Sequence, residues 1–526
     1  MRSGWRLFAV LLVLFAAAKV LATAGVTELG IDGAFYTDVA QYVRDGHGLQ
    51  TGQSLYHKGY SHFPHPTSIY PAWPLLLGIL ARVVDIQLLA HWLPAALWLA
   101  SLVAAWFLGS ALRPESFFQR VQVHGGHVLM LMLGLNTEYF TYTSMPYTEG
   151  LSWLLLLLFG TRLLRLAPRE DLVSAAEIGA WTGLLVLCRA QFLIVPIAVF
   201  AALSLRLGTG WRGLARLLVA MAVFAALLTP HMVRNAGILQ EAGLLTLLRF
   251  DQAQVSDALE PLPVLLQTEG VGGLLLDRAQ GLSLAFDPTS DRSYAVHFHA
   301  FIYALLLLPW AVWQRRRGLP TVLRRLLAPG STAWWVMGLF ALGGLASVHL
   351  AHKSYEPAWY FHRRHALVVL PAVFAACCAL LSLPGWKRAP GVLLLLTGLA
   401  QGSWELADAA REGTVESWAS RSKRDALHTW LLEESRDRNL VVAISSPDAQ
   451  RLAWRTPKVG FHSLHETSSP EVLDALCQDF KVDVVALHPG ATAGWAFRDG
   501  PLVAPTGYEA VDVRPSGFLL FRRTLP

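Results

Sequence analysis

Long runs of apolar residues, separated by short stretches that carry arginine, fill the first 410 residues of the chain. A helix that crosses a lipid bilayer needs about 20 apolar residues in succession. The pattern therefore predicts an all-α polytopic membrane protein with about eleven transmembrane helices. The predicted crossings are 6–24, 88–112, 123–144, 147–166, 175–187, 190–205, 214–234, 296–313, 332–351, 366–383 and 389–409.

Two of these runs, 175–187 and 190–205, are shorter than the norm and meet at Arg189. They could form two tight crossings or one long bent segment. Two crossings are favoured, because a single one would reverse the side on which every later loop lies.

The apolar run 69–84 is also short and begins with prolines. Counting it as a crossing would move Arg113 and Arg120 to the outer side, against the bias of basic loops toward the cytoplasm. We expect it to form a helix along the outer membrane surface, with its apolar residues toward lipid. Two large outer loops then result, 25–87 and 235–295.

Basic residues fall in every second loop when the N-terminus is placed in the cytoplasm, as the positive-inside rule requires. An odd number of crossings places the C-terminal tail outside. The first run, although 22–24 resembles a signal-peptidase site, is expected to stay as an anchor because many crossings follow. The basic residues of the inner loops are Arg113 and Arg120; Arg162, Arg165 and Arg169; Arg206, Arg212 and Arg216; Arg315, Arg316, Arg317, Arg324 and Arg325; and Lys387 with Arg388.

The tail beyond residue 410 changes character, because its charge rises and its apolar runs shorten. Residues 441–445, 459–462, 482–488 and 518–522 read as strands, and 469–480 reads as a helix. The predicted domains are therefore a transmembrane domain, 1–410, and a small extracytoplasmic α/β domain, 411–526.

The composition excludes two other classes of protein. Only 15% of the residues are charged and 54% are hydrophobic, whereas a soluble domain is about 25% charged. The net charge of +6 comes from arginines in short loops and follows membrane topology, not nucleic-acid binding. The four cysteines, three of them in apolar segments and without a CxxC motif, indicate neither a zinc site nor a disulfide framework.

Asp32 lies shortly beyond the first apolar run, so its carboxylate is tethered close to the membrane surface. Such a group can act as a general base on an acceptor hydroxyl or amine. The alternative is that Asp32 forms a turn with Gly33. Asp38 and Asp45 are rival acids in the same loop.

Other candidate residues lie at the outer ends of the predicted crossings. Glu149 is either a helix-start acid that matches the helix dipole or a carboxylate that binds substrate. The outer cations either bind a phosphate group or extend toward lipid head groups. These cations are Arg189, Arg234, Arg363 and Arg364, with His362 beside them.

Histidines crowd the first outer loop around Lys58, at His57, His62 and His65. They could hold a metal ion, since imidazole is a common ligand. No HExxH or paired-thiolate spacing supports a metal site. A polar wall for a sugar or an acceptor is therefore favoured.

Six features, taken in order along residues 1–409, resemble the GT-C superfamily of integral membrane glycosyltransferases. Protein O-mannosyltransferases and aminoarabinose transferases, with their bacterial relatives, are the nearest groups. The features are Asp32 with Tyr36, the proline-containing helix 70–76, Pro146 through Glu149, Arg189 with Pro196, Pro230 through Asn235, and Tyr360 through Arg364. One departure is Gly33, which stands where the family often has a second acid.

The resemblance implies a bacterial inner-membrane enzyme that transfers a sugar from a polyprenyl-phosphate donor to a glycan, lipid or protein acceptor outside the cytoplasm. Asp32 would deprotonate the acceptor, and the configuration at the anomeric carbon would invert. No cofactor is required by this scheme, and a divalent cation stays open. Glu149, Tyr36, His57 and Lys58 would bind substrate, while Arg363, Arg364, Arg234, Arg189 and His362 would hold the donor phosphate.

Three other functions stay open at this point: a transporter or flippase of lipid-linked glycans, an oligosaccharide ligase or polymerase, and a non-catalytic membrane scaffold. Transporters place their sites near the middle of the bilayer, often on broken helices in two related halves. Here the notable polar groups lie at the outer ends of the crossings, and no related halves are visible. Glycosyl transfer is therefore favoured.

Overall fold

The computed structural model divides the chain into two compact units. The first unit comprises Met1–Ala22, Pro94–Ser144 and Thr148–Ala410, and the second comprises Thr23–Leu93, Met145–Tyr147 and Arg411–Pro526. The structure describes residues 2–26, 29, 31–54, 64–118, 122–166, 171–193, 195–197, 199–200, 211–239, 307, 309–311, 370–412, 417–444, 446–456, 458–463, 470–487, 504–513 and 518–524.

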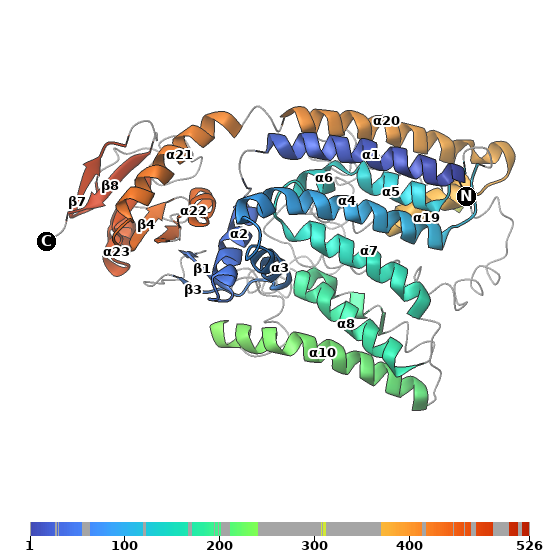
Figure 1. The fold of residues 1–526 in the computed structure, drawn as a ribbon, viewed down its shortest axis with the longest axis horizontal. Coiled ribbons are helices and arrows are strands. Elements are labelled where there is room, and N and C mark those ends of the chain that lie inside the picture. Colours follow the sequence, from blue (N-terminus) through green and yellow to red (C-terminus); the bar gives the residue numbers. More distant parts are fainter. Residues whose placement is uncertain are drawn as a thin grey trace, which may run out of the picture. The chain divides into compact units, whose positions relative to one another are not determined.

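The described part of the first unit is mostly helical (Figure 1). Two short 3-10 helices, Ala190–Leu193 and Gly385–Arg388, accompany the longer elements. The α-helices of this unit, three of which (α1, α4 and α20) extend into the second, are α1 (Arg2–Gly25), α4 (Ile86–Leu112), α5 (Gly125–Gly134), α6 (Thr137–Tyr142), α7 (Thr148–Leu166), α8 (Leu172–Cys188), α10 (Trp211–Leu239), α19 (Leu370–Leu381) and α20 (Ala389–Glu412).

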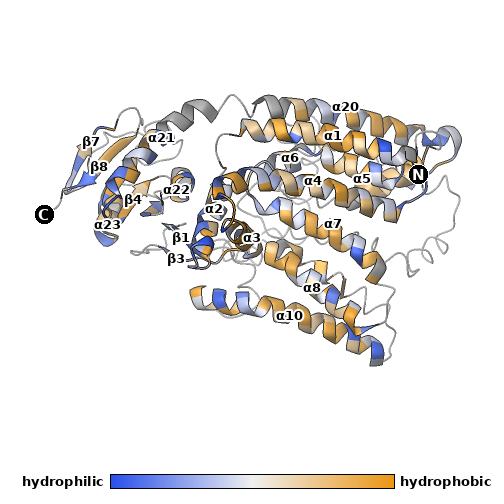
Figure 2. Cartoon of the chain, in the orientation of Figure 1, coloured by the Kyte–Doolittle hydropathy of each residue, from blue (hydrophilic) through white to orange (hydrophobic). Residues whose placement is uncertain are grey.

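Helix length and hydropathy indicate a membrane protein. Among the described residues, Gly4–Gly25, Ile86–Leu112 and Trp211–Ile238 are long and apolar enough to cross a bilayer. Figure 2 shows that hydrophobic residues cover most of α1, α4 and α8. The total of about eleven crossings stays a prediction, since several of the predicted runs lie partly or wholly outside the described residues.

The predicted run 123–144 is two helices, α5 and α6, and not one. The break falls at Asn136, whose side-chain oxygen accepts a hydrogen bond of 2.6 Å from the backbone N–H of Tyr139. Asn is a favoured N-cap residue because it satisfies a helix-start N–H that has no partner within the helix. Hydropathy averaged over about 20 residues hides this break, although Thr137 and Glu138 directly after Asn136 are polar.

Small residues let the helices of the first unit approach closely. A Cβ atom on Gly109 of α4 would lie 2.5 Å from the carbonyl oxygen of Gly125 on α5. A Cβ on Gly179 of α8 would likewise collide with the backbone of Ala220 on α10. Small residues at helix contacts are typical of membrane proteins, where packing rather than exclusion of water holds helices together.

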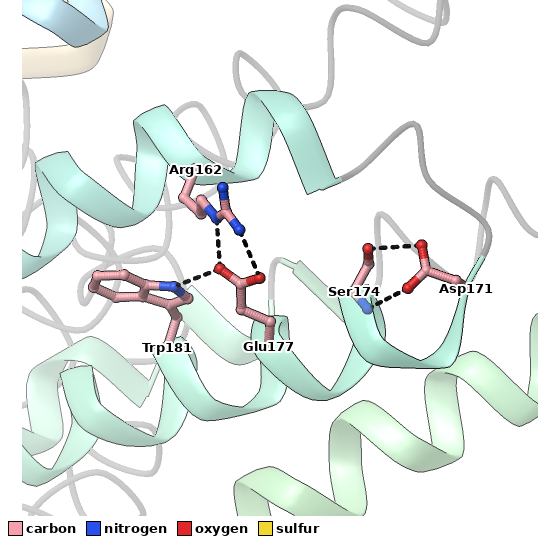
Figure 3. Close-up of polar contacts among 5 residues, drawn as sticks. All are labelled: Arg162, Asp171, Ser174, Glu177 and Trp181. Carbon is pink, nitrogen blue, oxygen red and sulfur yellow. Dashed lines mark hydrogen bonds and ion pairs between the residues drawn. The ribbon is translucent and has the colours of Figure 1, made fainter.

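Helices α7 and α8 form an antiparallel pair that an ion pair joins near one end (Figure 3). The Arg162 guanidinium donates to both carboxylate oxygens of Glu177, at 2.6 and 3.1 Å. The Trp181 indole N–H also donates to Glu177, at 3.3 Å. Arg162 is one of the residues that the positive-inside pattern assigned to the cytoplasmic face.

The second unit is built on a six-stranded sheet in the order β2-β5-β4-β6-β8-β7. Strands β2, β5, β4 and β6 are parallel, and β8 and β7 are antiparallel to their neighbours. The strands are β2 (Gln53–Ser54), β4 (Leu440–Ile444), β5 (Val459–Ser463), β6 (Val484–Leu487), β7 (Tyr508–Val511) and β8 (Leu519–Arg523). The helices are α2 (Ile31–Arg44), α3 (Ala72–Leu80), α21 (Ser417–Glu434), α22 (Ser446–Ala453) and α23 (Pro470–Asp479).

Both faces of this sheet are covered. Val442, Ile444 and Phe461 pack in a buried cluster with residues of α21 and α22, and Ala443 and Val485 pack in another cluster with α23. Alternating side chains point to opposite faces of a strand, which explains two separate clusters. The strands and the helix that the sequence predicted in the tail are confirmed as β4, β5, β6, β8 and α23, within two residues at each end.

One strand of the sheet comes from the segment 25–87, which the sequence predicted as the first outer loop, and not from the tail. Strand β2 pairs in parallel with β5, with Gln53 opposite Phe461. A second strand of the loop, β1 (Gln50–Thr51), pairs with β3 (His65–Pro66). Two-residue strands leave no alternation to detect in a sequence, so nothing indicated this pairing beforehand.

The sequence predicted a helix over 69–84. The structure confirms it for the central part of this run, which forms α3. One side is buried, at Trp73 and Leu77, whereas Ile79 and Val83 are 56% and 83% exposed. The Trp73 indole N–H donates to the carbonyl oxygen of Pro146 at 2.6 Å. The exposed apolar residues suit a helix at the membrane surface.

Substituting Gly78 by Ala is expected to lower the thermal stability of the protein. The new Cβ would lie 2.6 Å from the carbonyl oxygen of Ala40 and 2.7 Å from the Val43 Cβ, where α3 packs on α2. Overpacking of this kind costs about 1–3 kcal/mol. Gly237→Ala on α10 is the matched control, since nothing lies within 4 Å of its added Cβ. Equal melting temperatures for both variants in detergent would disprove the close approach.

Candidate functional site

Asp32 lies in the first turn of α2, and its side chain is partly exposed. Asp32 and Gly33 are both helical, so the turn interpretation is wrong. A carboxylate at this position is favoured by the partial positive charge at a helix N-terminus. Tyr36 follows one turn later and is buried, with its ring 6.1 Å from that of Phe35.

Gly33 explains why the chain lacks a second acid next to Asp32. A Cβ at this position would lie 2.9 Å from Cδ of Pro146 and 3.3 Å from the ring of Tyr147. A proline ring cannot swing away as a long side chain can. The close contact between α2 and the Pro146 segment therefore excludes any larger side chain at position 33.

Asp38, one of the rival acids, is engaged inside the second unit. Its Oδ2 accepts hydrogen bonds from the Thr51 hydroxyl at 2.6 Å, the Gly52 N–H at 3.0 Å and the Gln53 amide at 3.5 Å. Its side chain is buried, and this burial raises the pKa of Asp38 to about 6 despite the opposing effect of the three hydrogen bonds. A carboxylate enclosed in this way anchors the loop and does not face an acceptor.

Asp45, the other rival, is exposed and pairs with its neighbour Arg44 at 2.7 Å. The hydrogen bond from Arg44 lowers the pKa of Asp45. Both properties are those of a solvated helix end. Of the three acids, Asp32 keeps the position that a base requires, at the start of the helix and accessible to solvent.

Glu149 and Arg189, which the sequence linked to different ligands, form a buried ion pair in the first unit. Arg189 Nη1 lies 2.5 Å from Glu149 Oε1, and the two side chains are 11% and 3% exposed. Glu149 lies in the first turn of α7, and Arg189 ends α8 with extended backbone angles. An anion at a helix N-terminus and a cation at a helix C-terminus both suit the helix dipoles. The antiparallel packing of α7 on α8 brings the two charges together.

Arg234 belongs to a polar group near the end of α10. It donates to the side-chain oxygen of Asn235 at 3.2 Å, and the Asn235 amide donates to Nε2 of His231 at 3.1 Å. The side chain of Arg234 is half-buried. The guanidinium is thus held at the end of α10 next to Asn235 and His231.

Lys19 is a buried cation that the sequence analysis missed. Its ammonium group donates to the carbonyl oxygen of Phe140, to the Thr143 hydroxyl at 3.0 Å and to the Ser144 hydroxyl at 2.8 Å. It also lies 5.2 Å from the ring centre of Trp98. The lysine therefore caps the end of α6 and fixes the turn that leads to Glu149. A charged residue within an apolar run was the signal that could have revealed it.

Several predicted site residues lie outside the described part of the chain, namely His57, Lys58, His62, His362, Arg363 and Arg364. His65 is described, and its two ring nitrogens face the carbonyl oxygens of Pro66 at 3.0 Å and Gln53 at 2.9 Å. This histidine therefore stabilises the hairpin backbone. No cluster of three or more His, Cys, Asp or Glu residues that could hold a metal ion occurs among the described residues.

Comparison with known proteins identifies the fold. No family model and no curated protein sequence matches the chain. Among solved structures, an oligosaccharyltransferase of Archaeoglobus fulgidus with a tethered acceptor peptide is similar at a TM-score of 0.56 and 13% identity, over 90% of this chain and 68% of that one. The archaeal oligosaccharyltransferase AglB from the same organism, with an inhibitory peptide and a dolichol-phosphate, gives 0.55 and 12%, over 90% and 69%.

A second kind of relative matches over nearly its whole length. ArnT from Cupriavidus metallidurans, bound to undecaprenyl phosphate, is similar at a TM-score of 0.53 and 11% identity, over 98% of this chain and 97% of that one. A further structure of the Archaeoglobus enzyme contains zinc and sulfate. The chain therefore has a GT-C-like fold, a mostly helical polytopic membrane fold with an additional sheet domain.

Proposed function

We propose that this GT-C-like chain is a membrane glycosyltransferase, in which Asp32 is the general base and a polyprenyl-phosphate-linked sugar is the donor. The observation that carries the proposal is the position of Asp32, partly exposed in the first turn of the helix that follows the first membrane helix. The ligands of the structural neighbours, dolichol-phosphate and undecaprenyl phosphate, support a lipid phosphate as the donor. One neighbour carries a tethered acceptor peptide, which supports a transfer reaction in which a base activates the attacking group of an acceptor.

In the proposed reaction, Asp32 accepts the proton of an acceptor hydroxyl or amine as that group attacks the anomeric carbon. The bond between this carbon and the phosphate oxygen breaks, and its electron pair leaves with the polyprenyl phosphate. The sugar is thereby transferred with inversion. Positive groups near the leaving phosphate lower the barrier by stabilising the charge that develops there.

The other roles are proposed from the charge of each residue. Arg234, with Arg363, Arg364 and His362, is proposed to bind the donor phosphate, and Tyr36, His57 and Lys58 are proposed to line the substrate cavity. The ion pair between Glu149 and Arg189 is electrically neutral as it stands. Arg189 is proposed to contact the donor phosphate while it stays paired with Glu149, which it keeps oriented on the acceptor side. We place the reaction on the extracytoplasmic face of a bacterial inner membrane, with hexose or pentose as the sugar.

The proposed function is tested in a deletion strain and with the purified protein. Mass spectrometry of glycolipids and cell-envelope glycans is expected to show the loss of one hexose or pentose in the deletion strain. The purified protein in lipid nanodiscs is expected to transfer this sugar to an acceptor from one member of a panel of polyprenyl-phosphate sugars. A flippase would instead leave a lipid-linked precursor on the inner leaflet and would transfer no sugar in the purified system.

Arg234→Ala is expected to weaken donor binding by about tenfold or more, because hydrogen bonds to charged groups contribute about 1.5–3 kcal/mol. Arg363→Ala and Arg364→Ala are expected to act in the same direction, with a smaller effect on acceptor affinity. The matched control is Arg212→Ala, which removes an exposed arginine from the opposite end of α10. Equal affinity of all variants for a polyprenyl-phosphate sugar would discredit the phosphate assignment.

A further inference from the structure

Helix α2, which carries Asp32, packs between two elements of the second unit (Figure 1). On one side it contacts α3, and on the other it contacts α22 of the C-terminal domain. The Gln41 side-chain amide on α2 donates to the carbonyl oxygen of Trp454, directly after α22. The helix is therefore held by residues more than 400 positions away in the chain.

A second connection runs from α2 to the sheet through Asp38. The Asp38 carboxylate accepts from the backbone N–H of Gly52 at 3.0 Å, and the carbonyl oxygen of Gly52 accepts from the N–H of Phe461 at 2.9 Å. Phe461 is fully buried in the core of the sheet. Two hydrogen bonds thus join the interior of the C-terminal domain to the middle of α2.

The fit around Gly52 is close, so this connection has little freedom. A Cβ on Gly52 would lie 3.0 Å from the Tyr42 hydroxyl, 3.6 Å from the Asp38 carboxylate and 3.6 Å from the carbonyl oxygen of Val459. The segment that contains Gly52 is therefore enclosed between α2 and β5. Asp38 follows Asp32 by six residues on the same helix, which corresponds to about 9 Å along its axis.

We propose that the C-terminal α/β domain is a positioning element for the base, and that Asp38 and Gln41 are the positioning residues through which it holds α2. This inference rests on the proposed function, because it assigns the domain a role in the reaction of Asp32. Asp32 lies in the first turn of the same continuous helix of 14 residues that Asp38 and Gln41 hold. Fixing its middle and its far end therefore fixes the carboxylate.

The test compares three variants of the full-length protein, two at Asp38 on α2 and one at Asp45, directly after the end of this helix. Asp38→Ala removes the acceptor, Asp38→Asn keeps an acceptor oxygen in its place, and Asp45→Ala is the matched control at an exposed position. Asp38→Ala is expected to reduce kcat about 100-fold with little change in the donor KM, since a base displaced by about 1 Å loses that much. Asp38→Asn and Asp45→Ala are expected to keep most of the turnover.

Hydrogen exchange separates positioning from unfolding. In Asp38→Ala, the amides of α2 are expected to exchange faster while those of β4 and β6 keep their protection. If the sheet also loses protection in Asp38→Ala, the same measurements are made on Gln41→Leu. This variant removes only the side-chain hydrogen bond to the carbonyl oxygen of Trp454. Unchanged kcat despite faster exchange in α2, or unchanged exchange in α2, overturns the proposal. Absence of sugar transfer by the wild type overturns the proposed function instead, and the exchange data then still decide whether the domain holds α2.

Discussion

Asp32→Asn is expected to reduce sugar transfer by about 100- to 10,000-fold, which is the usual contribution of a general base. Asparagine has nearly the shape of aspartate but cannot accept a proton at neutral pH. The side chain is partly exposed at the start of α2 and asparagine has nearly the same volume, so the substitution is expected to cost little stability. The measurement is turnover of the purified protein with a polyprenyl-phosphate sugar.

Asp45→Asn, at the exposed position directly after the end of α2, is the control for this experiment and is expected to retain full turnover. Donor affinity is expected to be the same in both variants, because the proposed role of Asp32 concerns the acceptor. Turnover by Asp32→Asn within a few-fold of the wild type would remove Asp32 from the reaction. Unfolding of the variant would show up as a lowered melting temperature, which the isosteric change is not expected to cause.

Arg189→Met is expected to destabilise the protein strongly, by about 3–5 kcal/mol, because it leaves the Glu149 carboxylate buried without its partner. The same helix pair supplies a matched control, Arg162→Met, which breaks the ion pair with Glu177 (Figure 3). The side chains of that pair are 42% and 29% exposed, so water can replace the lost contact and little stability is lost. Thermal unfolding in detergent measures both changes.

The double variant Glu149→Gln with Arg189→Met is expected to recover much of the lost stability, because it removes both buried charges. This outcome would show that the penalty comes from the unpaired carboxylate and not from the loss of packing by the arginine. Equal melting temperatures for Arg189→Met and Arg162→Met would contradict the burial of the Glu149 pair. Loss of transfer in the double variant at restored stability would support a role for the pair in the reaction.

The two ion pairs lie at opposite ends of the helix pair formed by α7 and α8. Glu149 precedes Arg162 by thirteen residues on α7, which places them about 20 Å apart along the helix axis. The exposed pair of Arg162 and Glu177 is solvated by water. The charges of Glu149 and Arg189 are buried, and removing them from water costs desolvation free energy. A buried ion pair contributes little to stability, so a role in substrate binding explains this desolvation cost better. For this reason Glu149 and Arg189 stay in the proposed substrate cavity.

Several features of the fold could be predicted because they depend on short stretches of sequence. Transfer of a helix into lipid is a sum over about 20 neighbouring residues, so hydropathy located the membrane helices α1, α4 and α10. Strands β4, β5 and β6 were visible as short apolar runs in a polar tail. The GT-C-like fold could be inferred because its motifs recur in a fixed order.

Candidate site residues could be selected from the sequence for the same reason, and their roles stay a prediction. Asp32 was identified from its distance to the first membrane helix, and Glu149 and Arg189 were each identified as charges at the ends of apolar runs. Lys19 was overlooked because one lysine changes the mean hydropathy of a long run very little. The histidine-rich stretch suggested a polar wall, yet its described member, His65, bonds to backbone carbonyl groups.

By itself, the sequence determined that this chain is a membrane protein with a sheet domain, and which of its charges are unusual. Only the tertiary structure decided how those charges are used: Glu149 pairs with Arg189, Asp38 is enclosed, and Gly33 has no room for a second acid. The same holds for the strand that joins the first outer loop to the tail. The physical reason is that a buried charge or an open strand edge requires a partner, but which partner it finds depends on how distant segments pack.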